Sequence, residues 1–235
     1  PWTGCGVPFV TSTSDACSSP ARGLPGVVGW LDGQYWHFPL TGEWQRRHIT
    51  VTEALGYAGN VIIFGQAVGD MQHLIKGDAT GGLAMLMGTT GTNDLRYMRE
   101  RLERTQEWQH VSHTLWAQHL AGAANIFADL GSRNEWDTLA RVAAAYGVRL
   151  REVPLPPAFL DYAADVLANT TLYVPPAKRT RSSSADPFVP VNKYAYGVEA
   201  IEFMQQCPCT PPMLPRAAAA RAHTHVEPLQ AHART

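Results

Sequence analysis

Long hydrophobic runs are missing from this 235-residue chain, although 45% of its residues are apolar. No stretch approaches the roughly 20 apolar residues that a membrane-spanning helix needs. No basic-then-apolar leader is visible either, so the sequence shows no targeting signal. We therefore expect a globular protein without a membrane partner.

Cysteine is scarce as well, with 4 residues in the whole chain. Only Cys207 and Cys209 lie close together, and no spacing typical of a zinc site occurs. Scattered cysteines are typical of proteins in a reducing environment. This scarcity predicts an intracellular protein, in the cytoplasm or the nucleus.

A basic excess is also absent, because 19 Lys and Arg residues stand against 20 Asp and Glu residues. Residues 1–168 carry 12 basic and 16 acidic residues, a difference of −4, and residues 169–235 carry 7 basic and 4 acidic residues. Proteins that hold a duplex through many phosphates usually carry a basic excess. Composition alone therefore does not point to nucleic acid.

The hydrophobic pattern predicts an alternation of strands and helices. Residues 8–17 are rich in β-branched and aromatic side chains and precede a Ser-Ser-Pro turn, which predicts a strand that carries Asp15. Asp32-Gly33 between two strand-like runs predicts a tight hairpin. Thr50 and Glu53 have the spacing of a capping box, which predicts a helix start. The expected strands span residues 8–17, 26–31, 34–40, 71–76 and 112–121, and the expected helices span residues 50–68, 79–87, 93–108, 125 onward, 136–146 and 157–168.

This order of elements predicts an α/β fold around a mixed sheet, in which three antiparallel strands are followed by strands that alternate with helices. We expect the main domain to span residues 7–147 and a flanking helical extension to span residues 148–168. Residues 169–235 lose this periodicity and are rich in Pro, Ser, Ala, His and Arg. That composition predicts a disordered tail.

Four carboxylates lie at the ends of expected elements: Asp15, Glu53, Asp78 and Asp129. Each has a structural explanation when it is taken alone. Asp15 could cap a turn, and Glu53 could complete the capping box. Asp78 could be a helix N-cap, and Asp129 suits the first turn of a helix that Asn125 caps.

The residues around these acids form an ordered set of motifs. They are Ser14-Asp15-Ala16, H-I-x-x-x-E from His48 to Glu53, G-D-A-T from Gly77 to Thr80, and N-x-x-A-D-x-x-S-R from Asn125 to Arg133. This set resembles the ribonuclease H domain of retrotransposon reverse transcriptases, such as those of DIRS-like, tyrosine-recombinase-type or related elements. The resemblance covers about residues 9–136, and the last motif is its most specific part.

The resemblance implies a ribonuclease H-like fold and endonucleolytic cleavage of the RNA strand of RNA–DNA hybrids. Two Mg²⁺ ions, for which Mn²⁺ can substitute, would activate water and relieve charge on the leaving oxygen, and such ions prefer carboxylate ligands. Asp15 would bridge both ions. Glu53 and Asp78 would bind one ion and Asp129 the other. His119, ten residues before Asp129, would assist product release, unless it is simply a histidine packed at a strand end.

Residues near the acids are candidates for contacts with nucleic acid: Arg46, Arg47, His48, Thr80, Asn125 and Arg133. Arginine forks suit phosphates, but Arg46, Arg47 and His48 could equally form a solvated loop. Trp36 and Trp44 are the tryptophans best placed to meet a nucleic acid, with core packing as the alternative. The expected partners are an RNA–DNA hybrid and a reverse transcriptase domain upstream in the same polyprotein.

Three positions depart from the family pattern. Ala79 stands where Asn is common, Gly131 stands where Leu is usual, and no glycine follows Trp30. Two other interpretations therefore stay open: a catalytically decayed connector or nucleic-acid-binding module, and a DNA-cutting integrase or transposase relative. The chain contains no Y-x-D-D polymerase motif and begins without methionine, so we expect it to be part of a longer polyprotein.

Overall fold

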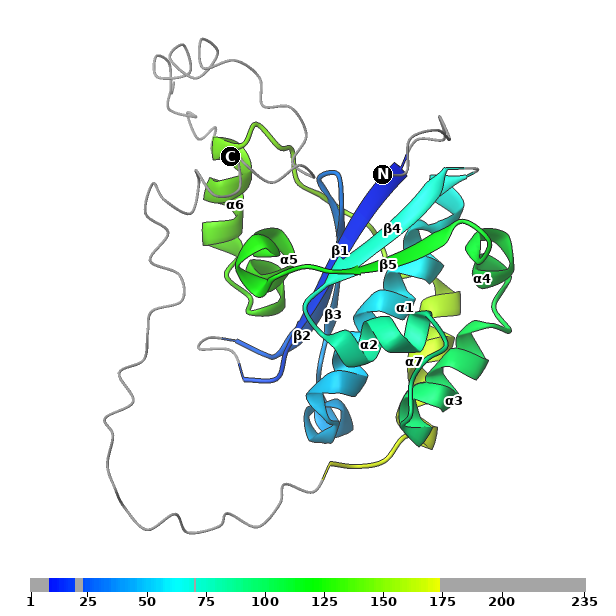
Figure 1. Ribbon diagram of the computed structural model, residues 1–235. Helices are drawn as coiled ribbons and strands as arrows, with labels where there is room; N and C mark the ends of the chain where they lie inside the picture. The colour runs from blue at the N-terminus through cyan, green and yellow to red at the C-terminus, as the bar shows by residue number, and fades with distance from the viewer. Residues whose placement is uncertain (1–8, 20–22, 70, 174–235) are drawn as a thin grey trace, which may run out of the picture. The chain divides into compact units, whose positions relative to one another are not determined.

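The computed structural model describes residues 9–19, 23–69 and 71–173, so residues 174–235 of the tail predicted for residues 169–235 lie outside these ranges. The described part is built around one six-stranded sheet with the strand order β5-β4-β1-β2-β3-β6 (Figure 1). The strands are β1 (Phe9–Cys17), β2 (Gly26–Leu31), β3 (Gln34–Pro39), β4 (Gln72–Gly77), β5 (Leu115–His119) and β6 (Arg151–Glu152). The helices are α1 (Ile49–Val68), α2 (Thr80–Leu86), α3 (Asn93–Leu102), α4 (Gln106–Val111), α5 (Ile126–Ser132), α6 (Trp136–Ala145) and α7 (Pro157–Asn169).

Strand direction divides the sheet into two halves. β2 is antiparallel to both of its neighbours, β1 and β3, and Asp32 and Gly33 form the tight turn between β2 and β3 with positive φ angles of 45° and 79°. β4 is parallel to β1, and β5 is parallel to β4. The predicted α/β fold, with three antiparallel strands followed by strands that alternate with helices, is confirmed.

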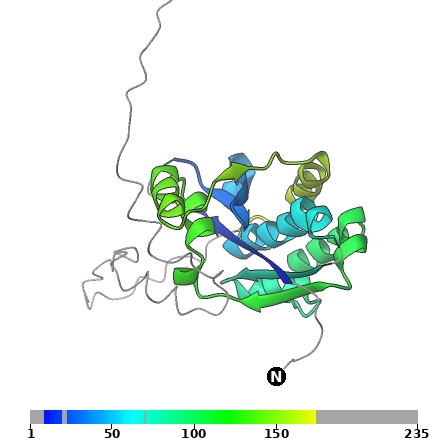
Figure 2. The ribbon, with the colours of Figure 1, turned by 90° about the horizontal axis from the view of Figure 1, so that it is seen from above.

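Helices cover both faces of the sheet. α1 packs on β1 and β2 from one face, whereas α5 packs on the same two strands from the other (Figures 1 and 2). Alternation along β1 explains this arrangement, because successive side chains of a strand point to opposite faces. Ser14 contacts the α1 side, where a Cβ at Gly56 would lie 3.0 Å from its Oγ, while Asp15 receives a hydrogen bond from Ser132 of α5.

The start of α1 differs from the prediction. His48, not Thr50, is the N-cap, and its Nδ1 accepts a hydrogen bond of 3.2 Å from the Thr50 backbone N–H. The predicted capping box is therefore wrong, and Glu53 is buried instead of reaching back to the helix start. The glycines of α1 allow close packing on the sheet, since a Cβ at Gly59 would lie 2.4 Å from the Trp36 ring.

A polar network lies in the core between α1 and the sheet. Ser12 Oγ of β1 and His73 Nε2 of β4 are 2.8 Å apart, and Asn60 of α1 donates to both Ser12 Oγ and the Thr13 carbonyl. Trp36 of β3 donates to Asn60 Oδ1 at 3.0 Å. Burial lowers the pKa of His73 to about 4, so this histidine is neutral at physiological pH. Asn60 thereby links α1 directly to β1 and β3, and through Ser12 to His73 of β4.

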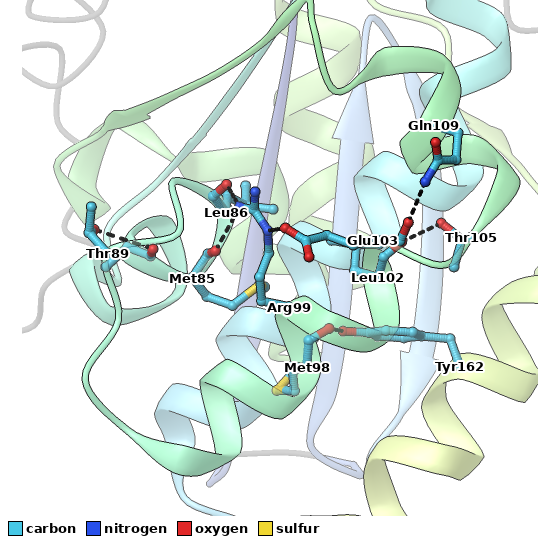
Figure 3. A network of polar contacts seen from close by, with 11 residues as sticks. Met85, Leu86, Thr89, Met98, Arg99, Leu102, Glu103, Thr105, Gln109 and Tyr162 are labelled. Atoms are coloured by element: carbon cyan, nitrogen blue, oxygen red, sulfur yellow. Dashed lines mark hydrogen bonds and ion pairs between the residues drawn. The ribbon is translucent and has the colours of Figure 1, made fainter.

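The single helix expected at residues 93–108 is divided into α3 and α4. Thr105 caps α4 by accepting a hydrogen bond from the Trp108 backbone N–H, because its hydroxyl can replace a helical carbonyl at that point. Arg99 of α3 donates to the Met85 and Leu86 carbonyls at the end of α2 and forms an ion pair of 2.5 Å with Glu103 (Figure 3). These contacts hold α2, α3 and α4 together.

The segment predicted as a flanking helical extension, residues 148–168, packs on the sheet and on α3. β6 pairs with β3 in parallel, and Phe159 of α7 is buried against Trp36 and Phe38. Tyr162 of α7 donates a hydrogen bond to the Met98 carbonyl of α3 at 2.9 Å (Figure 3). No helix within the described ranges is long and apolar enough to cross a membrane.

Arg47 fixes the end of α7. Its guanidinium is buried and donates to the Leu167 and Thr170 carbonyls, which are among the last acceptors of that helix. The preceding Arg46 is exposed. The prediction that Arg47 contacts nucleic acid is therefore corrected, because its charged group is used inside the protein.

The two consecutive arginines provide a stability test. Replacing Arg47 by Ala should lower the free energy of unfolding by about 2–4 kcal/mol, because two helix-terminal carbonyls lose a charged donor in a buried site. Replacing Arg46 by Ala should change it by less than about 0.5 kcal/mol. Urea denaturation of the full chain measures both values, and equal effects would contradict the assigned role of Arg47.

Candidate metal centre

Asp15 lies at the centre of the candidate site. Its side chain is 6% exposed and points toward α5, where Ser132 Oγ donates a hydrogen bond of 2.6 Å to Asp15 Oδ2. The same hydroxyl lies 3.0 Å from the Asp129 carbonyl oxygen. Ser132 therefore fixes one oxygen of Asp15 and links β1 to α5.

Glu53 and Asp78 approach Asp15 from two other elements. Glu53 lies in the second turn of α1, where the Ala16 backbone of β1 donates a hydrogen bond to it. Asp78 directly follows β4, whose parallel pairing with β1 places the carboxyl ends of both strands together. The Tyr57 hydroxyl accepts a hydrogen bond of 3.1 Å from the Ala79 N–H and so holds the turn that carries Asp78.

These three acids form a compact group of oxygen ligands. One carboxylate oxygen from each of Asp15, Glu53 and Asp78 lies within 4.8 Å of the other two. Glu53 Oε2 is buried and has no hydrogen-bond partner, whereas Asp78 is exposed. The group is thus open to solvent on the Asp78 side and contains an unsatisfied acceptor on its buried side.

Asp129 approaches the same region from α5 but is not part of this group. Its Oδ1 accepts a hydrogen bond of 2.9 Å from Arg133 Nε, one turn later in the chain. The start of α5 is held by Asn125, whose Nδ2 donates 2.8 Å to the Ser14 carbonyl. Asp129 therefore lies beside the three-acid group with an ion-pair partner of its own.

Burial and mutual repulsion raise the pKa values of the two inner acids. The pKa of Asp15 is raised to about 7, first by burial and then by the charges of Asp129 and Asp78, against the lowering effect of the Ser132 hydrogen bond and Arg133. Burial raises the pKa of Glu53 well above its ordinary value, and the charges of Asp15 and Asp78 raise it further. The charge of Asp15 thus interacts with that of Asp129 as well as with those of Asp78 and Glu53.

The remaining predicted residues lie at different depths. His119 is exposed at the end of β5 and pairs in register with Gly77, which places it next to the turn of Asp78. Thr80 is exposed at the start of α2. Arg46 is exposed before α1, as is His48, whose ring packs edge-to-face against Tyr173 at 4.9 Å between centroids.

Besides Arg47, three of the predicted nucleic-acid residues are buried. Asn125 is 2% exposed, and its amide holds α5 against β1, so the prediction that it contacts nucleic acid is corrected. Trp36 and Trp44 are 0% and 5% exposed and belong to the core, which favours the packing alternative for both. Arg133 keeps 32% side-chain exposure and contacts Asp129.

The sequence prediction did not identify Tyr57 and Ser132 as part of the site. Ser132 belongs to the N-x-x-A-D-x-x-S-R motif, so its presence three residues after Asp129 was visible, but its contact with Asp15 of β1 was not. Tyr57 lies one helical turn after Glu53, which is a signal that could have placed it on the same face of α1.

Comparison with known proteins finds similarity among solved structures only. No protein-family model matches the sequence, and no curated protein sequence matches it. Among solved structures, the chain is similar to the RNase H1 of the halophilic archaeon Halobacterium salinarum NRC-1, with a TM-score of 0.40 and 19% identity over 55% of this chain and 98% of that one. The function proposed below therefore rests on the residues of this chain.

The raised pKa of Asp15 predicts a pH-dependent stability for the metal-free protein. A carboxyl whose pKa rises from 3.8 to about 7 on folding contributes stability below pH 4 that is lost as the pH rises through 7. In EDTA, the free energy of unfolding should therefore fall by about 2–3 kcal/mol more in the wild type than in Asp15→Asn between pH 5 and pH 8. Urea denaturation at both pH values measures the difference, and identical pH slopes would contradict it.

Proposed function

We propose that this chain is a metal-dependent nuclease of the ribonuclease H type, which cuts the RNA strand of RNA–DNA hybrids. The observation that carries the proposal is the group formed by Asp15, Glu53 and Asp78, with ligand oxygens within 4.8 Å of one another. Acids packed at this distance repel one another, and hard divalent cations relieve that repulsion.

The donor set fits a divalent cation. All three ligands are carboxylates, the type of donor that Mg²⁺ and Mn²⁺ accept. Glu53 Oε2 is buried without a hydrogen-bond partner, and an unsatisfied buried acceptor is costly unless a ligand completes it. Asp15, Glu53 and Asp78 would hold one ion, and Asp15 with Asp129 a second.

The chemistry that such ions supply is an activated water and relief of negative charge on the leaving oxygen of a phosphodiester. The chain itself orients the carboxylates. Ser132 donates a hydrogen bond to Asp15 Oδ2 and so fixes the orientation of this carboxylate. Tyr57 sets the turn of Asp78, while the position of His119 beside that turn supports a role in proton transfer during product release.

Exposed residues near the acids are proposed to contact the hybrid. Arg46 and His48 precede α1, which carries Glu53, and Thr80 follows Asp78 by two residues. The backbone phosphates of a hybrid are the chemical partner that an exposed guanidinium and hydroxyl suit. The ordered motif set supports the further proposal that the chain belongs to a retroelement polyprotein with a reverse transcriptase domain upstream.

Cleavage of a labelled RNA–DNA hybrid by the full chain in Mg²⁺ tests the proposal. Asp15→Asn and Asp78→Asn should each lower the rate by roughly 100-fold or more, because metal ions contribute several kcal/mol to transition-state stabilisation. Asp161→Asn changes an exposed acid of α7 outside the group and should leave the rate unchanged. EDTA should abolish cleavage in every variant.

Two outcomes would overturn this function. Absence of cleavage by a folded wild-type chain that binds hybrid would favour the decayed, duplex-binding interpretation. Acid-dependent cleavage of duplex DNA in preference to the hybrid would favour the integrase or transposase interpretation. Cleavage that Asp15→Asn leaves intact would show that the activity arises elsewhere.

A further inference from the structure

The fourth acid of the site has a cationic partner from its own helix. Arg133 Nε donates a hydrogen bond of 2.9 Å to Asp129 Oδ1 at the spacing i,i+4. The Asp129 side chain is 10% exposed, so this ion pair lies largely out of water at its acidic end. In such a site a charge-assisted hydrogen bond is stronger than on an open surface.

The two halves of the acid cluster therefore differ. Asp15, Glu53 and Asp78 already have oxygens within 4.8 Å of one another. The Oδ1 of Asp129 is instead occupied by a guanidinium nitrogen, which carries positive charge at a position where a cation would contact the carboxylate. Three acids whose oxygens already converge therefore stand beside a fourth carboxylate, one oxygen of which already has a positively charged partner.

We propose that Arg133 competes with the second divalent ion for Asp129, so that the two ions bind in a fixed order and with unequal affinities. The first ion binds to the three-acid group without displacing any side chain. The second ion binds only when Arg133 releases Asp129. This inference rests on the proposed function, because it assumes that the acids bind divalent cations.

The geometry of Arg133 permits this release. Arg133 is the C-cap of α5, and its side chain is 32% exposed, so the guanidinium can turn toward solvent. Ser132, the preceding residue, keeps its hydrogen bond to Asp15 and is 0% exposed. A change of side-chain rotamer at Arg133 would break its contact with Asp129 Oδ1, while α5 stays fixed on β1 through Ser132.

Binding of Mn²⁺ to the full chain, measured by calorimetry and by the paramagnetic resonance of free Mn²⁺, tests the inference without any substrate. The wild type should bind one ion tightly and a second ion much more weakly. Arg133→Gln should raise the affinity for the second ion by about tenfold, because the ion no longer has to displace a charge-assisted hydrogen bond, whose net contribution is of that order. The affinity for the first ion should change less, because the three-acid group lacks Asp129.

Three control variants isolate the contact. Arg141→Gln removes the same charge from α6, where Arg141 contacts Asp137 and Thr138, and should leave both affinities unchanged. Arg133→Lys keeps the positive charge and should keep the second ion weak. Asp129→Asn should abolish binding of the second ion, and Arg133→Gln should then have no effect.

The outcomes separate this inference from the proposed function. If the wild type binds no ion through Asp15, Glu53 and Asp78, the proposed function fails and the inference fails with it. If the first ion binds but Arg133→Gln leaves the second affinity unchanged, only the role of Arg133 is overturned. Two ions of equal affinity in the wild type would also overturn it.

Discussion

The structure depends on keeping several carboxylates together in a partly buried site. Desolvation and repulsion both oppose the charged forms of Asp15 and Glu53, as their raised pKa values show. The protein offsets this cost with hydrogen bonds from Ser132 and the Ala16 backbone, and with the charge of Arg133. These hydrogen bonds and this ion pair act only at short range and in a fixed geometry. The acids therefore stay together only while β1, α1 and α5 keep their relative positions.

Those mutual positions come from the face of β1 that carries no acid. On that side Asn60 of α1 donates to Ser12 and to the Thr13 carbonyl, and Ser12 contacts His73 of β4. A shift of β1 by one residue would break these buried hydrogen bonds and turn Asp15 away from α5, because the side chains of a strand alternate. The polar network in the core therefore fixes the register of β1, and this register keeps Asp15 directed toward α5. Because His73 is neutral, the network adds no charge to the core.

The sequence predicted elements with strong local signals and missed contacts between distant residues. The Asp32-Gly33 hairpin and the strand of Asp15 have local patterns, and both are present. The capping box at Thr50 was wrong because His48, two residues earlier, offers a competing acceptor and Glu53 is drawn into the core. Nothing local distinguishes Arg46 from Arg47. Only the docking of α7, more than a hundred residues later, decides which of them is buried.

The same limit applies to the acids. The sequence identified these residues, but it did not predict their contacts with one another and with other side chains. Motif order proposed the four carboxylates, but it treated Asp129 as equivalent in kind to Glu53 and Asp78. Side-chain contacts distinguish them, because Asp129 has an arginine from its own helix and the other two lack such an i,i+4 partner among the ion pairs of the described residues. Spacing along α5 places Arg133 one turn after Asp129, yet the consequence depends on Asp15 approaching from another strand. The presence of the four acids alone therefore does not define such a site. The charged partner that each acid has in the metal-free protein also determines how the site binds a metal.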